Sequence, residues 1–135
     1  MTTATQLTLH LLILIGIYEF AAGFAGVTGR ISWPAMIDEF ERSPALSFMT
    51  GFMVFVLGGV VIMVHCIWTD LPAIIVPAIG WIAAAEGLLI MVWPQPLLAF
   101  SRRLIRNQRA ISIFALLFGA ALILLGLTGR VAPTL

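Results

Sequence analysis

Apolar residues gather in four long stretches of this chain, and most of the polar residues lie between them. The stretches cover about residues 6–28, 45–68, 73–93 and 110–129. A hydrocarbon core of about 30 Å is crossed by about 20 helical residues, and lipid cannot satisfy free backbone groups. The pattern therefore predicts an all-α fold, a four-helix transmembrane bundle that forms one integral membrane domain over residues 1–135.

Two of the connections have a helical pattern of their own. In residues 33–42, four apolar side chains are spaced so that they lie on one face of a helix: Trp33, Met36, Ile37 and Phe40. Residues 96–108 are built in the same way, with arginines on the opposite face. We expect both segments to be short amphipathic helices in the membrane interface. The order of long, short and long helix then occurs twice, which leaves a duplicated helical hairpin as an open alternative.

Composition narrows the class of protein. The chain is 61% hydrophobic and 10% charged, whereas a soluble domain has about a quarter charged residues. Its net charge of +1 leaves no broad basic surface for nucleic acid. Its single cysteine excludes an intrachain disulfide and a metal site built on a thiol pair. The first stretch lacks a basic leader and a cleavage site, so we expect it to stay as a helix.

The arginines predict an orientation. Six of the seven lie in the two long connections: Arg30, Arg42, Arg102, Arg103, Arg106 and Arg109. Only Arg130 lies on the other side. Cytoplasmic loops are enriched in Lys and Arg. We therefore expect a multi-pass protein of the bacterial inner membrane, with both amphipathic connections in the cytoplasm and both termini in the periplasm.

Two carboxyl groups lie within the predicted spans. Glu19 and Glu86 are each about 13 residues into a helix that enters from the same side, so both are expected near the bilayer midplane. A charged acid there costs several kcal/mol, so such a group is protonated, paired or turned toward a cavity. We expect Glu19 to be neutral and to make a polar contact, with Tyr18 or Glu86 among the partners. A site that carries protons or a cation is the alternative.

Small residues accompany both carboxyls and indicate where helices approach each other closely. On the first helix and the third helix they form faces beside Glu19 and Glu86. The residues expected in these contacts are Gly16, Gly23, Gly26, Gly80, Ala84 and Gly87.

Two histidines are expected at the periplasmic border. His10 is one turn into the first helix and His65 is near the end of the second. Histidines on facing helices can hold a haem or another tetrapyrrole. The alternative, which we favour, is that each forms hydrogen bonds at headgroup level, with no cofactor and no metal.

The two short helices carry opposite charge, "DEFER" in one and "SRRLIRNQR" in the other. They can pair within the molecule, dock on a neighbouring subunit or hold anionic lipid. The residues expected to contact lipid or a partner are Arg102, Arg103, Arg106 and Arg109.

The stretches "DEFERSPALSFMTG", "HCIW" and "GWIAAAEGLLIMVWP" resemble a loose group of small four-helix inner-membrane proteins from bacteria. The resemblance covers the whole chain and implies no established activity. Small multidrug transporters also have four helices and a glutamate in the first. Their short connections and their other hallmark residues are absent here, so their site is not carried over.

The sequence contains no phosphate loop, nucleophile elbow or zinc-helix motif. We therefore expect a non-enzymatic accessory or structural subunit of a larger membrane assembly, such as a respiratory or photosynthetic electron-transfer complex. Its expected partners are membrane lipids and other transmembrane subunits, in a homo- or hetero-oligomer. The alternative is a small oligomeric transporter, coupled to protons or ions, that uses Glu19 and Glu86.

Overall fold

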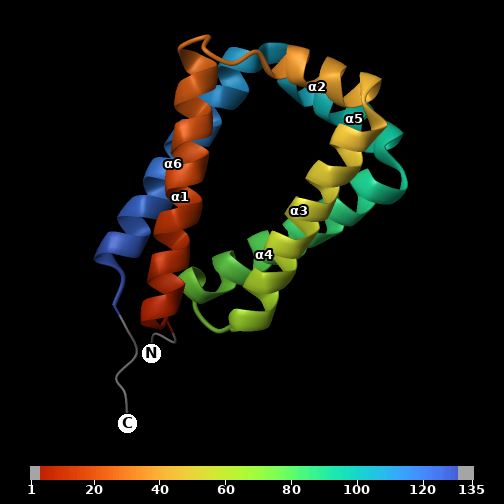
Figure 1. The fold of residues 1–135 in the computed structure, drawn as a ribbon. Coiled ribbons are helices and arrows are strands. Elements are labelled where there is room, and N and C mark those ends of the chain that lie inside the picture. Colours follow the sequence, from red (N-terminus) through yellow and green to blue (C-terminus); the bar gives the residue numbers. More distant parts are fainter. Residues whose placement is uncertain (1–3, 131–135) are drawn as a thin grey trace.

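The computed structural model describes residues 4–130, which are helical and contain no strand. Figure 1 shows the chain as long helices joined by two shorter ones. The helices in chain order are α1 (Gln6–Val27), α2 (Trp33–Arg42), α3 (Pro44–Val64), α4 (Leu71–Val92), α5 (Pro94–Leu104), the 3-10 turn η1 (Ile105–Asn107) and α6 (Gln108–Thr128).

Four helical stretches are long and apolar enough to cross a membrane. They are Gln6–Val27, Pro44–Val64, Leu71–Val92 and the continuous stretch Pro94–Thr128, which joins α5, η1 and α6. The predicted multi-pass membrane protein with four transmembrane helices is confirmed at this level. The interfacial position of α2 and α5 and the duplication of the hairpin stay predictions.

Short polar residues and prolines fix where the helices begin. Ser43 accepts a hydrogen bond from the backbone N–H of Leu46, and Pro44 follows at the first position of α3. Asp70 caps α4 in the same way, through the N–H of Ala73. A capping oxygen satisfies one free N–H of the first turn, and proline lacks the N–H that would otherwise be unpaired there. The chain therefore turns sharply between consecutive helices.

The long helices pack as two pairs, α1 with α6 and α3 with α4. Glycines form both seams: a Cβ atom at Gly23 would collide with the backbone N of Leu116, and one at Gly87 would collide with that of Phe55. Any side chain there would push the backbones apart. The small residues singled out in the sequence are all buried: Gly16, Gly23, Gly26, Gly80, Ala84 and Gly87.

The two pairs meet at one end and diverge toward the other (Figure 1). At the closed end, which includes residues 65–70, the buried core joins α1, α4 and α6 through Leu9, Leu12, Val76 and Leu122. At the other end α2 and α5, with 10 and 11 residues, separate the pairs by about 15 Å of helix each. The four long helices therefore pack as two pairs that meet at one end, an arrangement that the predicted four-helix bundle left unspecified.

Candidate functional site

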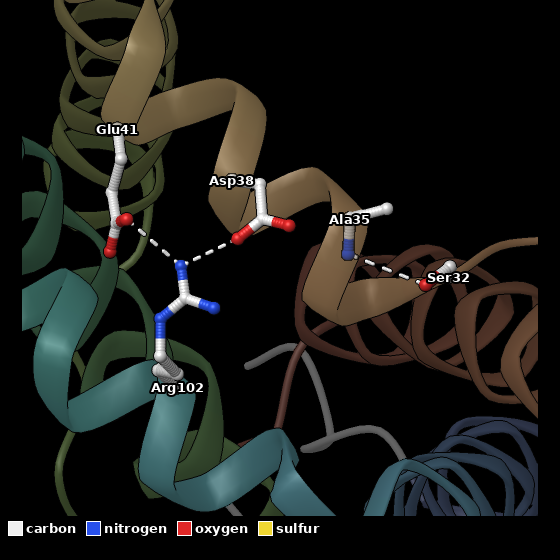
Figure 2. Close-up of polar contacts among 5 residues, drawn as sticks. All are labelled: Ser32, Ala35, Asp38, Glu41 and Arg102. Carbon is white, nitrogen blue, oxygen red and sulfur yellow. Dashed lines mark hydrogen bonds and ion pairs between the residues drawn. The ribbon is translucent and has the colours of Figure 1, made fainter.

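At the diverging end, α2 and α5 lie against each other and are joined by ion pairs. Figure 2 shows Arg102 reaching from α5 to two acids on α2. Its Nη2 atom lies 2.8 Å from Asp38 Oδ1 and 2.9 Å from Glu41 Oε2. Asp38 and Glu41 are three residues apart, so they share one side of the helix. Of the three arrangements open to the oppositely charged helices, this one pairs them within the molecule.

The other arginines of this connection are arranged differently. Arg103, Arg106 and Arg109 are exposed, and none of them forms an ion pair within residues 4–130. Their contact with anionic lipid or with a partner stays a prediction. Arg102, by contrast, already has two acidic partners.

Two polar residues of α6 attach the start of α2 to the first helix pair. The backbone N–H of Trp33 donates to Gln108 Oε1 at 3.0 Å, and its indole N–H donates to Ser112 Oγ at 3.1 Å. The Gln108 amide in turn donates to the carbonyls of Gly26 and Ile31. The short helices are therefore anchored to α1 and α6, and they close the space between the pairs at this end.

Beneath these short helices lies a cavity of about 340 Å³, which we call the inter-pair cavity. Most of its wall is apolar, and four polar side chains interrupt it: Tyr18, Thr50, Glu86 and Ser101. None of these four side chains makes a hydrogen bond within the part of the chain that the structure describes. The lining comes from α1 to α5, with Ile105 of η1, so the cavity exists only when both helix pairs and the short helices are assembled.

The structure brings the two membrane carboxyls and Tyr18 to the same region. Glu19 and Glu86 lie close enough to interact electrostatically, and both interact with Tyr18. Glu19 is half-buried on the edge of the glycine face of α1, while Glu86 is exposed in the isolated chain and lines the inter-pair cavity. No hydrogen bond to Glu19 or Glu86 occurs among residues 4–130. The expected polar contact of Glu19 therefore stays a prediction.

A larger groove of about 770 Å³ opens at the same end, between α3 and the junction of α4 and α5. Its wall includes Phe48, Met49 and Met91. Glu41 contributes the carboxyl of this groove, and it is already paired with Arg102. The smaller inter-pair cavity is therefore the better candidate site, because its carboxyl forms no ion pair within the described part of the chain.

The two histidines are not brought to a common site. His65 is buried at the end of α3, where Nε2 pairs with the Thr8 hydroxyl, and Nδ1 has no partner in the described chain. His10 is exposed and follows Thr8 by two residues on α1. Two residues turn a helix by about 200°, so His10 points away from the side that meets His65. This arrangement does not supply a pair of facing ligands for a haem.

No group of three or more metal-binding side chains occurs among residues 4–130. Comparison with known proteins finds no matching family model, no matching curated protein and no matching solved structure. The resemblance to small four-helix inner-membrane proteins therefore stays an expectation.

Sequence reasoning missed several residues that build this region. Thr8, Gln108 and Ser112 anchor neighbouring elements, and Thr50 and Ser101 line the inter-pair cavity. Their polarity was visible within or beside apolar stretches. However, a lone hydroxyl in a membrane helix can equally bond to its own backbone, as Thr128 does here. Only the packing of the helices distinguishes the two cases.

Proposed function

We propose that this protein is a non-catalytic structural subunit of a larger assembly in the bacterial inner membrane. The observation that supports the proposal is the divergence of the two helix pairs beneath α2 and α5. In an 18-residue apolar stretch of each of the four spans, only 17% to 28% of the residues are buried within the chain. Such open apolar faces in a membrane are covered by lipid or by helices of other subunits.

The proposed orientation puts α2 and α5 at the cytoplasmic surface, where their apolar faces lie in the interface. The supporting pattern is the concentration of arginines in these connections. Arg103, Arg106 and Arg109 are then available to anionic headgroups. Exposed Cys66 gives a native probe of this topology. An impermeant maleimide should label it in intact spheroplasts, and labelling only after lysis would reverse the orientation.

The subunit role is tested by purifying the tagged full chain in mild detergent and analysing the native-gel band by mass spectrometry. We expect other membrane proteins to be retained at a fixed molar ratio. The ratio should survive a second purification through a tag on the partner. Recovery of this chain alone, or of partners in varying amounts, would remove the support for a subunit.

A second candidate function is proton- or ion-coupled transport. The observation that favours it is the gathering of Glu19, Glu86 and Tyr18 beside one cavity. A transporter should move protons or ions when reconstituted alone in liposomes, and Glu86→Gln should abolish that flux because an amide cannot release a proton. Flux that is absent from the native chain would eliminate this candidate and leave the subunit role untouched.

A further inference from the structure

The inter-pair cavity combines a carboxyl group with an apolar wall, and no Lys or Arg among residues 4–130 lines it as a counter-ion. Glu86 supplies the carboxyl group that lines the cavity. A carboxylate in apolar surroundings is stabilised by a positive charge close by. Electrostatic complementarity therefore favours a cationic ligand over a neutral or anionic one.

The remaining polar groups fit one kind of cation. Tyr18, Thr50 and Ser101 each present a hydroxyl oxygen that can accept a hydrogen bond, and none of these hydroxyls is used within residues 4–130. An ammonium group has up to three N–H donors and no acceptor. Tyr18 and Trp33 also line the cavity, and aromatic rings can attract a cation.

The rest of the cavity wall favours a ligand whose remaining part, apart from the cationic group, is apolar. It is built of aliphatic and aromatic side chains, among them Met36, Ile37, Val54 and Leu97. The volume of about 340 Å³ is at the small end of the range of about 300–1,000 Å³ for ligand pockets. Because Glu86 is exposed in the isolated chain, a ligand dissolved in the membrane can reach it from the space between the helix pairs.

We propose that the inter-pair cavity binds a small amphiphilic amine in its ammonium form, with the nitrogen at Glu86 and the apolar body beneath α2 and α5. The site does not depend on assembly with a partner. Binding of the amine can therefore be measured on the purified chain without any partner protein. A negative result would count against the proposed ligand and not against the subunit role.

The probe is n-octylammonium, with n-octanol as the neutral analogue of equal chain length. Binding to the full chain in detergent is measured by titration calorimetry, with the heat of mixing into empty micelles subtracted. We expect saturable binding of n-octylammonium and none of n-octanol. Equal binding of the two would overturn the proposal, because it would mean that an alkyl chain alone occupies the cavity.

Two variants locate the bound ammonium. Glu86→Gln should weaken binding about tenfold or more, the effect of losing one charge-assisted hydrogen bond. Glu39→Gln is the matched control, because Glu39 is exposed on α2 and does not line the cavity. It should bind as the native chain does. Equal losses in both variants, or none in either, would place the ammonium elsewhere.

A third variant keeps the proposal falsifiable if Glu86→Gln does not fold. Val54→Trp narrows the cavity without changing any charge, and it should weaken n-octylammonium binding as well. The thermal unfolding midpoint of each variant shows whether the fold is retained. A folded Val54→Trp protein with native affinity would exclude the cavity as the site.

Discussion

Within each helix pair, glycines bring two backbones into contact, whereas the two pairs meet through an apolar core at one end and border a cavity at the other. At the seam of α3 and α4, a Cβ atom at Gly58 would lie 2.5 Å from the backbone N of Ala84. Between the pairs, Glu86 and Tyr18 instead line a cavity of about 340 Å³. At the seams an added side chain would meet backbone atoms, whereas the cavity has a mostly apolar wall, a few polar side chains and room for another molecule.

The seam is tested most directly by two adjacent glycines. Gly58→Ala should destabilise the protein by about 2–3 kcal/mol, because the new methyl meets backbone that cannot move aside. Gly59→Ala is the control, since a Cβ atom there would meet no heavy atom within 4 Å. It should be neutral or slightly stabilising, because alanine favours a helix over glycine. Unfolding in denaturing detergent measures both, and equal stability of the two variants would contradict a backbone seam.

The closed end depends on a hydrogen bond between the pairs. Thr8→Val removes the hydroxyl that pairs with Nε2 of buried His65 and that also accepts the Thr5 N–H in the cap of α1. We expect a loss of about 1–2 kcal/mol, because a buried polar atom is left without a partner. Thr128→Val is the control, since that hydroxyl bonds only to the Leu124 carbonyl of its own helix. If the two variants unfold alike, the Thr8 contact does not hold the pairs together.

A smaller effect is expected at Glu19, beside the space between the pairs. A protonated carboxyl resembles an amide in shape, so Glu19→Gln should retain the partners recovered with the native chain. Glu19→Leu removes the polar contact and should weaken assembly by about 1 kcal/mol or less, the scale of hydrogen bonds in membranes. The measurement is the molar ratio of partner to this chain after purification. Equal recovery with Leu and Gln would show that no polar contact forms there.

The smallest effect is expected at the ion pairs between α2 and α5. Arg102 and its two acidic partners are between 42% and 47% exposed, and exposed ion pairs contribute little to stability. Arg102→Gln should lower the thermal midpoint less than any variant above, and high salt should remove the difference from the native chain. Arg103→Gln is the control, because Arg103 forms no ion pair in the described chain. A large drop that persists in salt would show that Arg102 does more than join the short helices.

The helices could be predicted from the sequence because capping residues and the spacing of apolar side chains within each segment determine them. The predicted short helix over 33–42 coincides with α2, where Ser32 caps the first turn and Ser43 ends the helix. The second was predicted over 96–108, whereas α5 spans Pro94–Leu104 and continues through η1 into α6. No glycine or proline separates these last segments, and the boundary is marked only by Asn107, whose side chain caps the start of α6 through the N–H of Ala110.

The candidate site could be predicted from the sequence only in part. The two membrane carboxyls stood out because charge is rare in a span, and their shared depth follows from counting residues along each helix. The choice of helix partners did not follow, because small residues mark a close contact without naming the helix on the other side. Thr50 and Ser101 therefore could not be placed beside Glu86 before the helices were packed.

The sequence by itself determined the spans, the caps and the two charged short helices, because each of these depends on residues within a few turns of one another. Only the tertiary structure decided that α1 pairs with α6 and α3 with α4, and that Arg102 faces Asp38 and Glu41. The tertiary structure also placed the inter-pair cavity between the two helix pairs, beneath α2 and α5. These features depend on contacts between residues that are distant in the sequence, such as Asp38 and Arg102 or Gly23 and Leu116. Such contacts form only when the glycine seams and the lengths of α2 and α5 bring the helices together.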